Sequence, residues 1–279
     1  VLFRSGTNEA INKAISEAAT HLEEGNLAKA SEIASGVLAV LPDDARANFI
    51  YARCLIDTGD LQRAHAHLAQ AIASQPSFAD AHHAVGVLNQ MVGRNDAAVA
   101  AFTKALDFDP SHLQANLSLG LLHCNLGKFD EALALVEKVI SINSEVAAAH
   151  FVRGECLRGR DDQEATHAYK RAVMVNPEFA EAWFNLGVLS FQNNDFNGAV
   201  VALRQAARLL PDARPTSSYL GASLLEIGQF EEGLSEVGKS SGFLEFPADS
   251  DAPFRLVQFG SGNIEFTLTE NAKFALVDV

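Results

Sequence analysis

Histidine is the side chain in this sequence with the clearest capacity to bind a metal ion. The nine histidines include the pairs His65/His67 and His82/His83. Residues that are adjacent or two apart do not share one face of a helix, so neither pair has the spacing of helical metal ligands. We therefore expect histidines that are solvated or face a groove, and no metal site.

The cysteines Cys54, Cys124 and Cys156 are odd in number and far apart. This spacing is typical of neither a disulfide framework nor a zinc site; it indicates a reducing compartment, and we expect a cytoplasmic protein. Buried packing in helices is the expected role of Cys124 and Cys156. Since the sequence has no GxxxxGK[ST], HExxH or nucleophile-elbow pattern, we expect no catalytic residue, no cofactor and no enzymatic activity.

A glycine turn near the end of the chain has two competing interpretations. The string Leu256–Gly262, followed by Asp278, is similar to the first strand, glycine turn and second-strand acid of a Rossmann-like methyltransferase. However, Ile264 stands where a third glycine is expected, and Ile264–Thr269 alternates like a strand. The segment 243–279 is thus expected to be β-rich, either as a three-stranded meander or as the start of a truncated nucleotide-binding domain.

Composition predicts a folded and acidic protein. The chain has 279 residues, 48% of them hydrophobic, and a net charge of −14. This charge repels nucleic acid and anionic membranes, so we expect a protein or peptide partner of basic or apolar character. No run approaches the roughly 18 uninterrupted apolar residues of a membrane-spanning helix.

Neither end of the sequence is expected to be a natural end of the protein. Val1–Ser5 resembles the translation of a sequencing adapter, and we expect residues 1–10 to be a leader of non-native or adapter-derived origin. The apolar ending Leu276–Val279 has no turn or polar tail. We therefore expect a fragment of a longer chain.

A repeat of about 34 residues organises most of the sequence. A proline row at this spacing consists of Pro42, Pro76, Pro110, Pro177 and Pro211, with Ser144 in the fourth place. Parallel rows hold alanine, small residues and glycine: Ala30, Ala64, Ala98, Ala132, Ala165 and Ala199; Ala18, Ala52, Gly86, Gly120, Gly154, Gly187 and Gly221; Gly25, Gly59, Gly93, Gly127, Asn194 and Gly228. Several rows in one phase predict a solenoid.

Each row has a physical role in a pair of antiparallel helices. Small residues such as Gly86 and Ala98 let the two helix backbones approach where they cross. Gly93 ends the first helix in the left-handed conformation, which Asn194 adopts in the sixth unit. Between Gly154 and Ala165 the spacing is 11 residues where other units have 12, so we expect an altered crossing and a kink there.

These rows resemble the tetratricopeptide repeat, with the best agreement from Ala180 to Pro211. The residues in phase there are Trp183, Leu186, Gly187, Ala199, Leu203, Ala206 and Pro211. Seven units are predicted to start near Ile11, Ala45, Ala79, Leu113, Ala147, Ala180 and Arg214, over residues 11–242. The resemblance implies an all-α fold, a right-handed superhelical solenoid of antiparallel helix pairs. The segment 243–279 is the expected cover for its last apolar face.

The resemblance also implies a concave groove lined by first-helix residues. Transferring that phase predicts a partner-binding groove formed by Phe49, Arg53, His83, Val87, Met91, Leu117, Leu121, Asn125, Phe151, Glu155, Phe184, Val188 and Phe191. This row lacks the lysine, asparagine and arginine set of carboxylate-clamp members and the asparagine ladder of O-GlcNAc transferase repeats. We expect a non-catalytic scaffold that binds a protein or peptide. The alternative is the helical recognition arm of a longer methyltransferase or glycosyltransferase.

Overall fold

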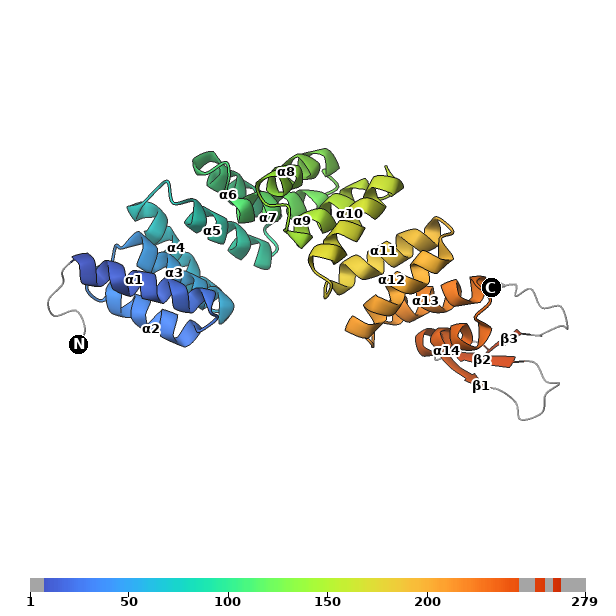
Figure 1. Ribbon diagram of the computed structural model, residues 1–279. Helices are drawn as coiled ribbons and strands as arrows, with labels where there is room; N and C mark the ends of the chain where they lie inside the picture. Colours follow the sequence, from blue (N-terminus) through green and yellow to red (C-terminus); the bar gives the residue numbers. More distant parts are fainter. Residues whose placement is uncertain (1–7, 246–253, 259–262, 267–279) are drawn as a thin grey trace. The chain divides into compact units, whose positions relative to one another are not determined.

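A computed structural model describes residues 8–245, 254–258 and 263–266 of the chain, with side chains up to Lys239 (Figure 1). The described helices are α1 (Asn8–Glu23), α2 (Leu27–Leu38), α3 (Ala45–Asp57), α4 (Leu61–Ser74), α5 (Ala79–Met91), α6 (Asn95–Phe108), α7 (Leu113–Asn125), α8 (Phe129–Ile142), α9 (Ala147–Leu157), α10 (Asp162–Val175), α11 (Ala180–Gln192), α12 (Phe196–Leu209), α13 (Arg214–Glu226) and α14 (Phe230–Ser241). These helices form seven consecutive pairs, as the repeat predicts.

The boundaries of the pairs follow the sequence phase closely. The helices α3, α5, α7, α9, α11 and α13 begin at the residues where the repeat units are predicted to begin. Helix α1 begins at Asn8, so Asn8–Ala10 of the expected leader are helical, and residues 1–7 lie outside the described part. A fixed repeat therefore sets where each helix starts.

The chain divides into two compact units, Val1–Ser144 with α1–α8 and Glu145–Val279 with α9–α14. Within each unit the core is built serially. In the first unit, one apolar cluster joins α1, α2 and α3 through residues such as Ile15, Val37 and Ile50. In the second, Tyr169, Leu186 and Leu189 belong to a cluster that joins α9 to α12. Each helix pair thus packs mainly on its sequence neighbours, as expected of a solenoid.

Helix crossings depend on the predicted row of small residues. A Cβ atom on Gly86 would lie 2.4 Å from the ring of Phe102, and one on Gly187 would lie 2.5 Å from Leu203 Cγ. Phe102 and Leu203 are fully buried, so neither can move aside into solvent. Glycine at the first-helix position is what allows a large residue on the second helix.

A recurring hydrogen bond ties several of the first helices to the loop before them. The fourth residue of the helix donates a side-chain N–H to the carbonyl oxygen of the row proline in two asparagine cases: Asn48 to Pro42 (2.8 Å) and Asn116 to Pro110 (3.1 Å). Trp183 Nε1 donates to the Pro177 carbonyl in the same way (2.9 Å). Proline therefore ends one helix and also presents an acceptor to the next.

The fifth repeat departs from the others where its spacing predicts a change. Helix α9 ends at Leu157, and Gly159 takes the left-handed conformation at φ 76°, a position missing from the predicted glycine row. The next turn is held by Asp162 and Asp161, whose side chains accept from the Gly159 and Glu164 amides. Asn194 adopts φ 60° as predicted. The missing residue shortens α9 and leaves the length of α10 equal to that of α8.

Three short strands follow α14: β1 (Gly242–Glu245), β2 (Phe254–Gln258) and β3 (Asn263–Phe266). They form an antiparallel sheet in the order β1-β2-β3, with Leu244 opposite Leu256 and Leu256 opposite Ile264. Residues 267–279 of the expected β-rich segment and the glycine turn 260–262 lie outside the described residues.

Candidate functional site on the first helices

The predicted groove residues of the first unit lie on α3, α5 and α7 and differ in exposure. Met91 is 55% exposed and Leu121 37% exposed, and Asn125 is also exposed. The half-buried members are Phe49, Arg53, His83, Val87 and Leu117. Two of the apolar predictions therefore present substantial surface to solvent.

In the second unit the predicted residues lie on α9 and α11 and are more buried. Phe151, Glu155, Phe184 and Phe191 are half-buried. Val188 is only 6% exposed, which contradicts the expectation that its side chain lines a groove. The cause is the packing of α11, whose residues from Leu186 to Ser190 are all buried.

The predicted phenylalanines pack against the next repeat. The Phe49 ring lies 5.1 Å from Phe78, measured between ring centroids, and Phe151 lies 5.0 Å from Phe179. Phe191 likewise lies 5.6 Å from the ring of Tyr219. These aromatic contacts join one first helix to the start of the following repeat. Much of the surface of these phenylalanines is therefore buried within the fold and is not available to a partner.

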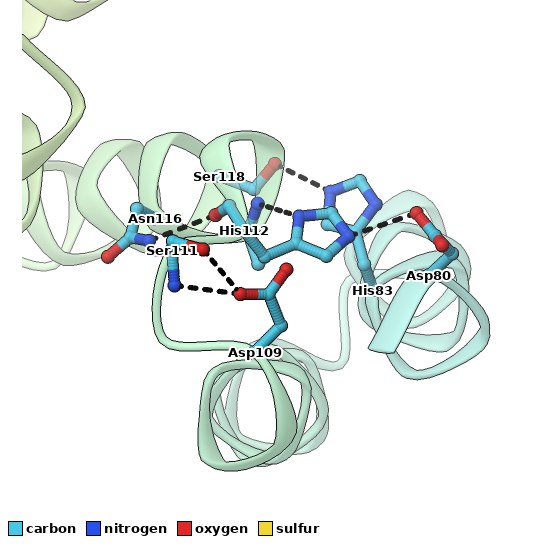
Figure 2. A network of polar contacts seen from close by, with 8 residues as sticks. Asp80, His83, Asp109, Ser111, His112, Asn116 and Ser118 are labelled. Carbon is cyan, nitrogen blue, oxygen red and sulfur yellow. Dashed lines mark hydrogen bonds and ion pairs between the residues drawn. The ribbon is translucent and has the colours of Figure 1, made fainter. Parts of the chain in front are cut away.

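A polar network occupies the same face of the first unit between α5 and α7 (Figure 2). His83 Nε2 and Ser118 Oγ share a hydrogen bond of 3.1 Å. The His83 ring also lies 5.3 Å from the ring of His112 and 5.4 Å from that of Phe102. This bond places the predicted surfaces of α5 and α7 side by side.

Burial is the main reason that His83 stays neutral. Burial, followed by the positive charges of His112 and Arg53, lowers the pKa of His83 to about 4. Asp80 opposes this effect only weakly. His83 is therefore neutral at neutral pH and adds no charge to this face.

His112 stands at the start of α7 and contacts two elements. Its Nδ1 accepts a hydrogen bond from the Ala115 amide (3.2 Å), and its Nε2 lies 3.1 Å from Asp80 Oδ1 on α5. The hydrogen bond to Asp80 raises the pKa of His112 and lowers that of Asp80. The histidine thus caps one helix and bonds to another.

A second polar cluster surrounds Glu155 in the second unit. Its Oε1 accepts hydrogen bonds from the Tyr169 hydroxyl and from Asn185 Nδ2 (2.6 Å), and its Oε2 pairs with Arg158 (3.3 Å). The carboxylate is therefore already engaged by residues of α10, of α11 and of the turn after α9. It is less available to a basic partner than the sequence suggests.

Sequence reasoning missed Asp80, His112 and Ser118. A signal for His112 exists, because it immediately precedes a helix start, where residues with side-chain acceptors are favoured. The contact of His83 with Ser118 has no local signal, since the two residues are 35 apart in the chain. The histidines His67, His82 and His83, expected to be solvated or groove-facing, are half-buried and hydrogen-bonded.

The described residues offer few groups for chemistry. Among them, no cluster of three histidine, cysteine or carboxylate side chains could hold a metal ion. In the same part of the chain, every helix is too short or too polar to cross a membrane. What the first helices do present is surface, apolar at Met91 and Leu121 and polar near His83.

Comparison with known proteins identifies the class. Profiles of the tetratricopeptide repeat match residues 21–88, 91–152 and 157–218. Because these matches cover more than half of the chain, it belongs to the tetratricopeptide repeat family. No curated protein matches the sequence.

Solved structures share this fold at low sequence identity. The Pseudomonas aeruginosa pilF structure has a TM-score of 0.67 and 20% identity, covering 80% of this chain and 97% of pilF. YrrB, titled a TPR protein with an unusual peptide-binding site, has a TM-score of 0.55 and 23% identity, covering 67% of this chain and 96% of its own. A chain of the APC/C hetero-tetramer Cut9-Hcn1 has a TM-score of 0.66 and 18% identity, covering 80% of this chain and 44% of that chain.

The enzyme-arm alternative is not favoured. The glycine turn 260–262 and Asp278 lie outside the described residues. After that turn, Asn263–Phe266 forms strand β3, where a nucleotide-binding turn would start a helix. The family and its structural neighbours instead support an interaction scaffold.

Proposed function

We propose that this protein binds an apolar segment of a partner protein across the first helices α5 and α7. The observation that carries the proposal is the exposure of Met91 and Leu121 on neighbouring first helices. The hydrogen bond between His83 and Ser118 holds the same faces of these helices together. Exposed methionine is a typical contact of surfaces that accept partner segments, because its side chain adapts to varied shapes.

Two further features support the choice of partner. YrrB has a peptide-binding site on the same fold, and the net charge of −14 favours partners with basic flanks. The half-buried Val87 and Leu117 extend the apolar surface on α5 and α7. An apolar anchor flanked by lysine or arginine is therefore the partner chemistry that we propose.

Two more proposals concern the setting of this site. The odd number and wide spacing of the cysteines support a reducing compartment, and we place the protein in the cytoplasm. We also propose that the β-rich segment after α14 covers the exposed end of the array, because a solenoid needs its last apolar face protected. The pairing of β1 directly after Ser241 supports this role.

A peptide selection tests the binding proposal. The full chain would be used to select binders from a random phage-displayed peptide library, and the selected peptides would be titrated by fluorescence anisotropy. We expect the double substitution Met91→Glu with Leu121→Glu to weaken binding at least about tenfold, since it removes two apolar contacts. Selected peptides should carry an apolar anchor.

A matched control separates surface position from general charge effects. Met174 on α10 and Val201 on α12 are 69% and 62% exposed, and Met174→Glu with Val201→Glu adds the same two charges elsewhere. This control should bind as the parent protein does. Equal affinities for both double variants would place the site elsewhere, and a selection without saturable binders would overturn the proposal.

A further inference from the structure

His112 makes two hydrogen bonds that together require one protonation state. The Ala115 amide donates to Nδ1 (3.2 Å), so Nδ1 carries no proton, and Nε2 must donate its proton to Asp80 (3.1 Å). Only the neutral imidazole protonated at Nε2 does both. Figure 2 shows the ring between the start of α7 and Asp80 on α5. The ring is 7% exposed, so bulk water does not readily replace either partner.

The groups around His112 favour a second proton. Asp80 on α5 faces it directly, and Asp109, in the loop before α7, adds a second negative charge. Asp109 is held by hydrogen bonds from the Ser111 amide (2.9 Å) and hydroxyl (2.6 Å). Together the carboxylates outweigh burial and raise the pKa of His112 above its usual value of 6.5. His112 is therefore expected to gain its second proton at a higher pH than an ordinary histidine.

The positive groups near His112 do not titrate in the same range. The pKa of His83 on α5 lies at about 4, so His83 stays neutral while His112 gains its proton. Arg53 on α3 is a fixed positive charge that acts on Asp80 and His83. The neighbouring Ser118 carries no charge at any relevant pH. As the pH falls, His112 thus gains its proton before His83 does.

The incoming proton has only one place to bind. It adds to Nδ1, which changes from an acceptor into a donor and then faces the Ala115 N–H. The hydrogen bond that caps α7 is lost, while the bond to Asp80 becomes a charge-assisted ion pair. Protonation therefore exchanges a bond within repeat 4 for a stronger bond between repeats 3 and 4.

We propose that His112 is a protonation switch that releases the first turn of α7 while it holds α5 and α7 together through Asp80. The released turn includes Asn116, whose Nδ2 donates to the His112 carbonyl (2.9 Å). Ser118, which bonds to His83, lies in the next turn. If the binding surface on α5 and α7 proposed above is correct, partner binding there depends on the protonation state of His112.

Hydrogen exchange on the full chain tests the switch without any partner. The protection factor of the Ala115 amide, corrected for the intrinsic exchange rate, would be measured between pH 8 and pH 5.5. We expect it to fall about fivefold, the usual worth of one helix cap. Over the same range, the ¹⁵N shift of His112 Nδ1 should move from the unprotonated to the protonated value.

Three variants make the test specific. His112→Ser keeps a capping side chain that does not titrate, so its Ala115 protection should not depend on pH. Asp80→Asn changes a side chain that is 57% exposed, so the fold should persist, and its transition should move to lower pH. His65→Gln removes an exposed histidine and should leave the transition unchanged.

The outcomes separate this inference from the proposed function. Identical pH dependence in the parent and His112→Ser, or an Nδ1 that stays unprotonated at pH 5.5, would overturn the switch. A failed peptide selection with the exchange transition intact would overturn the binding surface alone. Where both hold, the affinity of a selected peptide should change across the same pH range in the parent and stay constant in His112→Ser.

Discussion

The second and fourth repeats begin their first helices on the same backbone plan with different side chains. The cap of α3 is Asp44, whose carboxylate accepts from the Ala47 amide (2.9 Å), whereas α7 is capped by His112. An aspartate keeps its capping acceptor at all but acidic pH, and a histidine loses its acceptor when it is protonated. One start is permanent near neutral pH and the other is conditional.

The asparagines that follow these caps show the same contrast. Asn48 and Asn116 each donate two bonds to the preceding backbone, but only Asn48 has its Oδ1 satisfied, by His67 Nδ1 at 2.8 Å. Burial lowers the pKa of His67, which keeps this donor neutral. At the equivalent place in repeat 4 stands Leu135, and the buried Asn116 Oδ1 has no protein partner among the described residues. Two equivalent positions can therefore share a backbone and differ in how completely their polar atoms are paired.

The largest expected effect concerns the helix crossing of repeat 4. A Cβ on Gly120 would lie 3.0 Å from Val136 Cγ1, and repeat 2 carries Ala52 at this place. We expect Gly120→Leu to lower the free energy of unfolding by about 1–3 kcal/mol or more, because it overpacks the crossing. Thermal melting against the exposed control Gln114→Leu checks this, and equal melting temperatures would contradict the crossing.

A smaller difference should separate the two asparagines. Asn48→Ala removes three hydrogen bonds and leaves the His67 Nδ1–H without its acceptor. We expect this to lower the free energy of unfolding by about 1–3 kcal/mol. Asn116→Ala removes two bonds and also an unpaired buried oxygen, so its cost should be about 1 kcal/mol less. Urea midpoints of the two variants give the comparison. If Asn116→Ala proves as costly as Asn48→Ala, the two sites are equally satisfied in solution.

The smallest expected effect comes from transplanting the donor. Leu135→His places a histidine opposite Asn116, as His67 stands opposite Asn48. The new hydrogen bond and the lost apolar contact of Leu135 largely offset each other, so the net change in stability should be small. A double-mutant cycle with Asn116→Ala should still show a coupling of about 0.5–1.5 kcal/mol. Zero coupling would mean that the two positions do not meet.

Much of the fold was predictable because the same pattern of small residues, glycines and prolines recurs in seven consecutive units. The starts of α3, α5 and α7 follow directly from rows that keep one phase. The fifth repeat shows the limit, since its short spacing predicted a change but not the left-handed Gly159 that ends α9. The turn after α9 changes its conformation to accommodate the missing residue. The residue types at the equivalent positions of the other repeats do not predict this conformation.

The candidate site was only partly predictable. Helical phase placed Met91, Leu121 and Val188 in one predicted groove; the first two side chains are exposed, and that of Val188 is buried. Phase determines the direction of a side chain on its own helix and does not report what the next helix places against it. Contacts 30 residues or more apart, such as Asn185 with Glu155, decided which polar groups are already engaged.

By itself, the sequence determined the helix pairs, their order and the family, because small residues, caps and prolines act on the chain within one repeat. Only the tertiary structure determined the protonation states and hydrogen bonds of His83, His112 and Asp80. Their protonation depends on burial and on charges that α3, α5 and α7 bring together from different repeats. Electrostatic energy follows distance in space, and packing rather than sequence spacing sets that distance.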